Sequence, residues 1–240
     1  MKRELMNWAV VLGLVFLFRS FAFGSYYIPS ESMVPNLLVG DRLEVSKFAY
    51  GYSRHSIFGS PRIFSGRIFA QPIERGDIAV FKLPRDGETD YIKRIIGLPG
   101  DVIEMRSGFL YINQQAVKRT KLEDFVFQDR KGNIRRVAQI EETLPSGRTF
   151  TTLDWLSNSL GDNVGPFHVP DGHYFGIGDN RDNSLDSRFP ERVGVGFVPA
   201  ENLVGRAVII LWSWTGRAKL TEPSTWADAL RLDRSFKRLR

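Results

Sequence analysis

The sequence predicts a mostly β protein that begins with one transmembrane helix. Three observations support this fold class. One long apolar run occupies residues 6–24. The rest of the chain consists of short runs rich in β-branched and aromatic residues, punctuated by Gly, Pro, Asn and Asp. Long helical periodicity is absent between the two ends. At 240 residues, the chain can bury one large core, or a core with a smaller second domain.

Residues 6–24, MNWAVVLGLVFLFRSFAFG, form the expected membrane anchor. They carry one charge, Arg19, and as a helix they extend about 30 Å, the hydrocarbon thickness of a bilayer. A cleavable signal peptide is the alternative, because a basic N-terminus precedes the run and Ala-Phe-Gly at its end is a small-x-small sequence. Arg19 favours the uncleaved anchor, since a charge at a helix end can reach the interface. Residues 1–5 would then stay cytoplasmic, and the long remainder would lie outside.

Several segments beyond the anchor have the composition of strands. They are IAVFKL (78–83), DYIKRIIG (90–97), the segment 103–113, TLPSGRTFTT (143–152), HYFGIG (173–178) and LVGRAVIILWSW (203–214). Two segments have the composition of loops, namely 51–76 and 153–167. The first loop mixes Ile and Phe with Arg, so we expect either contact with the membrane interface or a collapsed, buried arrangement.

Composition limits the chemistry that the chain can perform. There is no cysteine, so disulfides and thiolate metal sites are excluded. The three histidines, His55, His168 and His173, are separated in sequence, which argues against a histidine-rich metal centre. Catalysis, if present, must use hydroxyls, carboxylates and amines.

The net charge of +6 is concentrated at the C-terminus. The last ten residues, RLDRSFKRLR, carry a net charge of +4, which leaves the rest of the chain almost balanced. We therefore expect no nucleic-acid partner. Apolar side chains are interleaved with the basic ones, so the tail could be an amphipathic helix on anionic lipid, or else a solvated helix or frayed end. These side chains are Trp226, Leu230, Leu232, Phe236 and Leu239.

A pair of serines follows the anchor in PSESMVPNL, residues 29–37. A serine hydroxyl is a weak nucleophile and needs a base; without cysteine or a well-placed histidine, a lysine has suitable chemistry. Its pKa must fall well below the ordinary value of about 10.4, which burial among apolar groups can achieve. Lys93 in DYIKRIIG is one candidate, and Lys47 in RLEVSKFAYG is the other. Either lysine could equally be a solvent-facing strand residue.

Four blocks follow the anchor in order: PSESMVPNL, GDRLEVSKFAYG (40–51), RGDIAVF through DYIKRIIGLPGD (75–101), and GDNRDNSLDSR (178–188) with GFVPAENLVGRA after it. In this order they resemble the type I signal peptidases, the bacterial leader peptidase family of Ser/Lys proteases. The resemblance implies a signal-peptidase-like catalytic β core formed by 25–101 and 174–216. It further implies a second, smaller β domain inserted at 102–173 and a basic C-terminal tail at 217–240.

The resemblance also implies roles for particular residues. Ser32 corresponds to the nucleophile and Lys93 to its general base, which favours Lys93 over Lys47. Ser30 corresponds to the hydroxyl that completes the oxyanion hole with the Ser32 backbone N–H. Ser184 corresponds to the hydroxyl that orients the lysine amine. Three further residues, Asp179, Asp186 and Arg188, correspond to residues that support the geometry of the site.

The block GDNRDNSLDSR has a structural interpretation as well. Gly, Asp and Asn favour tight turns whose side chains bond nearby backbone groups, and its arginines can pair with its carboxylates. A metal site formed by Asp179, Asp182 and Asp186 is the alternative, which the adjacent arginines disfavour. The resemblance implies a mechanism that requires no metal and no cofactor.

The expected substrates are exported preproteins with signal peptides that end in a small-x-small (Ala-x-Ala) site. The resemblance implies that six residues line shallow apolar substrate pockets, although ordinary core packing would explain each one singly. They are Ile28, Pro29, Met33, Leu37, Tyr91 and Ile92. Strand addition is the expected docking mode. The enzyme is expected in the bacterial plasma (inner) membrane as a single-pass protein with its catalytic domain on the periplasmic side, in contact with the lipid bilayer and the secretion machinery.

Two other functions fit parts of the sequence. A self-cleaving transcriptional repressor would use the same Ser/Lys chemistry, but it needs a DNA-binding domain where this chain has an apolar anchor. A membrane-anchored β protein that binds exported partners without catalysis would need neither Ser32 nor Lys93. The chain also departs from the family pattern at Glu31, where glycine is common, and at Asn36, where threonine is frequent.

Overall fold

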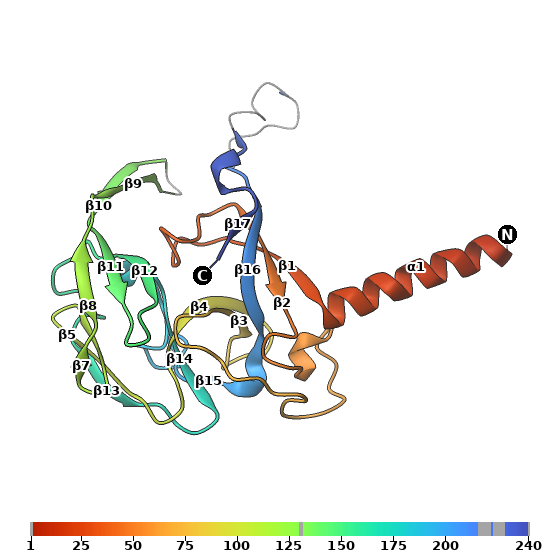
Figure 1. The fold of residues 1–240 in the computed structure, drawn as a ribbon, viewed down its shortest axis with the longest axis horizontal. Helices are drawn as coiled ribbons and strands as arrows, with labels where there is room; N and C mark the ends of the chain where they lie inside the picture. Colours follow the sequence, from red (N-terminus) through yellow and green to blue (C-terminus); the bar gives the residue numbers. More distant parts are fainter. Residues whose placement is uncertain (1, 130–131, 216–221, 223–228, 240) are drawn as a thin grey trace.

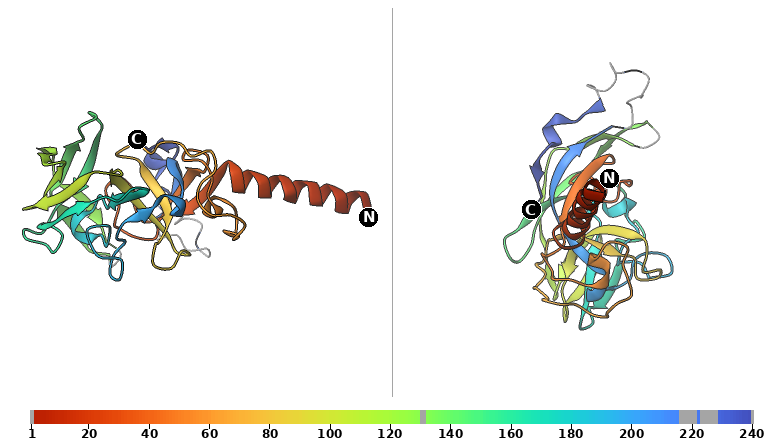
Figure 2. Two further views of the ribbon diagram at one scale, coloured as in Figure 1. Left: turned by 90° about the horizontal axis from the view of Figure 1, so that it is seen from below. Right: turned by 90° about the vertical axis from the view of Figure 1, so that its right-hand side faces the viewer.

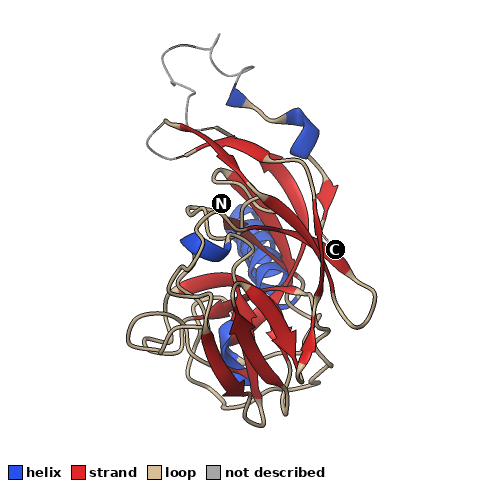
Figure 3. Cartoon of the chain, turned by 90° about the vertical axis from the view of Figure 1, so that its left-hand side faces the viewer, coloured by secondary structure: helices blue, strands red, loops and turns tan. Residues whose placement is uncertain are grey.

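The computed structural model describes residues 2–129, 132–215, 222 and 229–239. Among these residues, one α-helix, α1 (Lys2–Phe21), projects from a body built of β-strands (Figure 1). The mostly β fold with an N-terminal apolar helix is therefore confirmed. In the part of the chain that the structure describes, Figure 3 shows strands throughout the body and helix in α1 and a few short segments.

The strands of the body, in chain order, have the following bounds. They are β1 (Phe23–Tyr27), β2 (Asp41–Ser46), β3 (Ile78–Lys82), β4 (Asp90–Gly97), β5 (Val102–Arg106), β6 (Phe109–Ile112), β7 (Gln115–Ala116), β8 (Lys118–Lys121), β9 (Phe125–Gln128), β10 (Ile134–Val137), β11 (Gln139–Thr143), β12 (Thr149–Leu153), β13 (Val164–His168), β14 (His173–Ile177), β15 (Val198–Pro199), β16 (Leu203–Ser213) and β17 (Lys237–Arg238). Short 3-10 helices are η1 (Arg54–Ser56), η2 (Arg181–Asn183), η3 (Ala200–Asn202) and η4 (Leu232–Arg234).

Helix α1 exposes its apolar side chains. Trp8 is 65% exposed and Leu12 is 65% exposed, and Figure 2 shows the helix extending away from the body. Its segment Arg3–Phe21 is long and apolar enough to cross a membrane. The helix ends at Phe21 rather than at residue 24, because Phe23 already pairs with Ser46 in the first sheet.

The largest sheet has the strand order β1-β2-β16-β3-β4-β14-β15, and β17 also pairs with β16. All of its pairs are antiparallel. Apolar residues on the two faces of β4 follow the strand alternation: Ile92 packs in one core cluster, whereas Tyr91 and Ile95 pack in another. Because side chains alternate along the strand, Lys93 points to the same face of β4 as Tyr91 and Ile95.

Strands β5 to β13 form three smaller sheets, with the orders β13-β5-β6-β7, β12-β11-β8 and β10-β9. All of them lie within the segment 102–173. Their main core cluster contains Ile103 and Leu110 together with Phe175 and Ile177, which belong to the large sheet. The smaller sheets therefore pack onto β14 through a shared core.

Two loop or tail expectations were wrong in detail. The segment 153–167 was expected to be a loop, but its last four residues and His168 form β13, which pairs with β5. The tail is not an amphipathic helix over its described part, 229–239. It contains η4 and then β17, which pairs with Ile209 and Ile210 of β16. Strand β3 pairs with β16 only as far as Arg206, and β17 supplies backbone partners for Ile209 and Ile210, which a separate helix would not do. Trp226 lies outside the described residues.

A buried ion pair attaches this tail to the sheet. Arg234 Nη2 lies 2.5 Å from Asp41 Oδ2, and the two side chains are 8% and 0% exposed. The guanidinium also donates to the Asn36 carbonyl, at 2.9 Å. Residues 193 positions apart are thus joined next to the start of β2.

We expect Arg234→Ala to lower the free energy of unfolding by about 3 to 5 kcal/mol, because Asp41 would be left buried without its cation. The measurement is urea unfolding of the full chain in detergent. Lys237→Ala, at an exposed residue of β17, is the matched control and should leave the midpoint unchanged. Equal midpoints for the two variants would contradict the prediction.

Candidate active site

The serine pair lies in a compact turn between β1 and β2. The Leu37 N–H donates to the Met33 carbonyl at 2.9 Å, and the Val34 N–H donates to the Glu31 carbonyl at 3.1 Å. Ile28, Met33 and Leu37 are buried in one core cluster, which holds the turn against the large sheet. Ser32 is consequently held in place and is only 9% exposed.

Strand β4 brings Lys93 to this turn. Lys93 is 3% exposed, and its Nζ lies 2.9 Å from Ser32 Oγ although the residues are 61 positions apart. The Nζ also donates to the Ile92 carbonyl at 2.7 Å, and it lies 5.5 Å from the centre of the Tyr91 ring. The structure thus brings together the two residues that the resemblance pairs.

Burial lowers the pKa of Lys93 from 10.5 to about 8. Asp186 and Asp179 raise this pKa, and Arg188 lowers it, but desolvation of the amine is the largest effect. An appreciable fraction of the amine is therefore neutral near neutral pH, with a lone pair available to accept a proton from the Ser32 hydroxyl.

Ser30 lies beside Ser32, with 3.4 Å between the two hydroxyl oxygens. It is half-buried and faces the same site. A hydroxyl at this position can donate a hydrogen bond to an oxygen that forms at a carbonyl carbon attacked by Ser32 Oγ.

Ser184 reaches the site through the segment that follows β14. A Cβ placed on Gly178 would lie 2.2 Å from Ser184 Oγ and 2.6 Å from the Ser32 carbonyl oxygen. The three groups are therefore in direct contact. Ser184 is buried, and within the described residues no hydrogen bond joins its Oγ to Lys93.

Asp179 is the centre of a buried polar network beside the serine turn. Arg94 donates to both of its carboxylate oxygens, each at 2.8 Å, and Asn36 donates to Oδ2 at 2.8 Å. Asn36 also donates to the Thr151 carbonyl at 2.7 Å. The side chain that departs from the family pattern at position 36 therefore links the serine turn to β12.

Asn180, which the sequence did not single out, holds the nucleophile turn directly. Its backbone N–H donates to the Ser32 carbonyl at 3.1 Å, and its side-chain amide donates to the Glu31 carbonyl at 3.0 Å. Arg94 was missed in the same way. Asn180 follows Asp179 and Arg94 follows Lys93 in the sequence, and this adjacency could have drawn attention to both. Their hydrogen-bond partners lie too far away in the chain to be inferred from the sequence.

Asp186 and Arg188 brace the same loop. Arg188 donates to the two oxygens of Asp186 at 2.9 and 3.0 Å, and Asp186 accepts from the Gly178 N–H at 2.9 Å. Burial raises the pKa of Asp186. The Arg188 guanidinium and the hydrogen bonds lower it by more, so the pKa is below its ordinary value. Asp186 thus stays charged and fixes the Gly178 backbone.

The residues expected to line substrate pockets are divided among several environments. Four of them, Ile28, Met33, Leu37 and Ile92, belong to or pack against one core cluster. Tyr91 packs against the neighbouring cluster, and Pro29 is exposed. Ile28, Met33 and Leu37 are almost fully buried in the free protein.

Other titratable groups lie apart from this pair. Lys47 is buried and donates to the Ser56 carbonyl, and burial lowers its pKa to about 8. Its lowered pKa is therefore the one expected of a base, but its hydrogen-bond partner is a carbonyl and not a hydroxyl.

Three carboxylates approach within 4.8 Å of one another, those of Asp154, Asp162 and Asp182. Arg119 binds Asp154, and backbone N–H groups bind Asp162 and Asp182, which explains the cluster as a braced loop.

A buried serine hydroxyl bonded to a buried lysine amine, on a mostly β scaffold, is an arrangement that can supply a nucleophile and a base. The comparisons identify the family. The model of the family "Signal peptidase, peptidase S26" matches residues 1–212, and the chain belongs to this family.

Similar proteins include signal peptidase I of Rickettsia typhi, which is 36% identical over 99% of this chain and 94% of the relative. Signal peptidase I of Rickettsia prowazekii is 35% identical over 99% of this chain and 94% of the relative. A crystal structure of a signal peptidase I from Enterococcus faecalis is 29% identical, with a TM-score of 0.32, and covers 57% of this chain and 97% of that one. Members of the family cleave signal peptides, so this chain is a signal peptidase, a serine protease that acts on preproteins.

We expect Gly178→Ala to lower kcat/KM on a preprotein by about 100-fold, because the added methyl would displace Ser184 or the Ser32 backbone. The rate of cleavage by the purified full chain measures this. Gly13→Ala is the control, since a Cβ at Gly13 meets nothing within 4 Å. Cleavage by Gly178→Ala at the wild-type rate would show that the contact is not needed.

Proposed function

We propose that this protein is a membrane-bound endopeptidase that cuts preproteins after a small-x-small (Ala-x-Ala) site by means of a Ser32/Lys93 dyad. The observation that carries this proposal is the contact of 2.9 Å between Lys93 Nζ and Ser32 Oγ in a buried site. No metal or cofactor is needed, because the hydroxyl and the amine supply the nucleophile and the proton transfers.

In the acylation step, neutral Lys93 takes the proton of the Ser32 hydroxyl while Oγ attacks the scissile carbonyl carbon. The Ser30 hydroxyl and the Ser32 backbone N–H donate hydrogen bonds to the resulting oxyanion. The Lys93 ammonium then protonates the leaving amine, which is the new N-terminus of the exported protein. Water, deprotonated by the same amine, hydrolyses the acyl-enzyme and regenerates Ser32.

The remaining site residues act by position. Asp179 and Asn180 hold the turn that carries Ser32. Asp186 and Arg188 fix the backbone of Gly178, and with it the position of Ser184. Ser184 would orient the lysine amine from its position beside Gly178.

The proposed substrate class rests on the apolar residues next to the dyad and on the resemblance to the family. An extended signal peptide would place its last small side chain against Met33, Leu37 and Ile92, and its backbone along β4 by strand addition. Ile28, Pro29 and Tyr91 would complete shallow pockets that exclude larger side chains. Helix α1 supports a location in the bacterial inner membrane, with the catalytic part on the periplasmic side close to the bilayer and the secretion machinery.

We expect Ser32→Ala and Lys93→Ala each to lower cleavage of a preprotein by at least about 10⁴-fold, because the dyad acts as a unit. The assay uses detergent-solubilised full chain, with sequencing of the product's new N-terminus. Lys47→Met is the matched control, since Lys47 is also a buried lysine of lowered pKa. If both dyad variants cut at the wild-type rate, the protein binds or cuts preproteins in another way.

The pH dependence tests the role of the amine. Because Lys93 must be neutral and its pKa is about 8, kcat/KM should rise with pH and level off above about pH 8. Asp186 raises the pKa of Lys93, so Asp186→Asn should move the rise to lower pH even if the maximal rate falls. Exposed Asp171→Asn serves as the control. A rise that stays in place, or moves to higher pH, would contradict the assignment of Lys93.

A further inference from the structure

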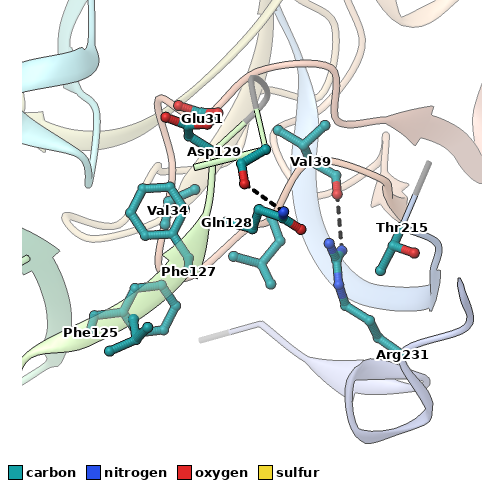
Figure 4. A pocket seen from close by; sticks show the side chains of 12 residues that line it. Glu31, Val34, Val39, Phe125, Phe127, Gln128, Asp129, Thr215 and Arg231 are labelled. Atoms are coloured by element: carbon teal, nitrogen blue, oxygen red, sulfur yellow. Dashed lines mark hydrogen bonds between the residues drawn. The ribbon is translucent and has the colours of Figure 1, made fainter. Parts of the chain in front are cut away.

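A pocket of about 620 Å³ adjoins the nucleophile turn. Glu31, which precedes Ser32, and Val34 form one wall, and the strand β9 forms another (Figure 4). Thr215 and Arg231 close the far side. Val34 belongs to a small core cluster against which Phe125 and Phe127 pack, so the apolar wall is part of the folded structure.

Strand β9 presents its edge to this pocket. Five consecutive residues, 125–129, line it, although alternate side chains of a strand point to opposite faces. The partner strand β10 contributes none of its residues to the lining. Within the described residues, β9 pairs only with β10, so its other edge is open to a further strand.

The hairpin register identifies the outward backbone groups. The Asp129 N–H donates to the Asn133 carbonyl at 2.9 Å. In an antiparallel pair, hydrogen-bonded and non-hydrogen-bonded positions alternate, so Val126, opposite Arg136, points its N–H and carbonyl out of the hairpin. Val126 is 48% exposed. An extended peptide could therefore bond to β9 at this residue without disturbing β10.

The position of the hairpin indicates which part of a substrate reaches it. Figures 1 and 2 place β9 and β10 on the part of the body remote from α1. A signal peptide approaches Ser32 from the membrane, where α1 lies, and the polypeptide after the cut must leave on another path. The pocket begins at Glu31, next to Ser32, and continues along β9.

We propose that the open edge of β9 and the adjoining pocket bind the start of the mature protein, the preprotein segment on the C-terminal side of the cut. This inference rests on the proposed function and extends it to the other half of the substrate. The segment binds as an added strand, bonded to the backbone of Val126, with alternate apolar side chains against Val34 and Phe127. Recognition through the backbone suits an enzyme whose products differ in sequence.

Proline at position 126 tests the backbone contact, because it removes the outward N–H but keeps the hairpin bonds. The full-length enzyme is assayed on a preprotein and on a peptide with the same signal sequence that ends at the first residue after the cut. We expect Val126→Pro to lower kcat/KM on the preprotein by about 5- to 10-fold and to leave the short peptide unchanged. Val126→Ala, which keeps the N–H, is the reference against which the loss in Val126→Pro is measured. Arg136→Pro, the same change on the outer edge of β10, should match wild type on both substrates.

Equal loss on both substrates, or no loss on either, would overturn the role of β9. If wild type cuts neither substrate, the proposed function itself fails, which is a different result.

Cross-linking gives a second measurement, because the chain has no cysteine of its own to react. In a Ser32→Ala background, Val126→Cys should form disulfides with preproteins that carry one cysteine shortly after the cut, and Arg136→Cys should not. Disulfides between two enzyme copies alone, or equal trapping by both cysteines, would also overturn the proposal.

Discussion

The burial of the Lys93 amine is the constraint on which the rest of the site depends. Apolar surroundings disfavour the ammonium form, and this lowers the pKa of Lys93 to about 8. A neighbouring carboxylate would undo the effect if its charge were left uncompensated. The two carboxylates that raise the pKa of Lys93, Asp179 and Asp186, are bound by Arg94 and Arg188 respectively. The amine instead meets a hydroxyl and a carbonyl, which tolerate its neutral form.

The same constraint explains why the site is assembled from segments that are distant in the chain. Ser32 comes from a turn anchored by buried apolar side chains, and Lys93 comes from a central strand of the sheet. The segment after β14 then closes over the turn, where the absence of a Cβ at Gly178 allows contact with the Ser32 carbonyl. Asn180 bonds to that carbonyl as well. A glycine at 178 and an asparagine at 180 thus allow this segment to pack directly against the backbone of the serine turn.

Local patterns predicted the parts of the fold that depend on local chemistry. The apolar run gave α1, and the β-branched run 90–97 coincides with β4. The C-terminal tail shows the limit of such patterns. Its mixture of basic and apolar residues fits an amphipathic helix, but Arg234 finds a buried partner in Asp41 and β17 finds a place on β16. Neither partner is visible from the ten residues of the tail, because both lie far away in sequence.

By itself, the sequence limited the class of chemistry: without cysteine and with scattered histidines, hydroxyls, carboxylates and amines remain as the reactive groups. It also left two lysines as candidates, and only resemblance to a family favoured Lys93. Tertiary structure distinguished them. Both lysines are buried with a lowered pKa, but only Lys93 lies within hydrogen-bonding distance of Ser32 Oγ, whereas Lys47 bonds to the Ser56 carbonyl. Desolvation follows from burial in any core, whereas the contact of one amine with one hydroxyl depends on how β4 and the serine turn pack together.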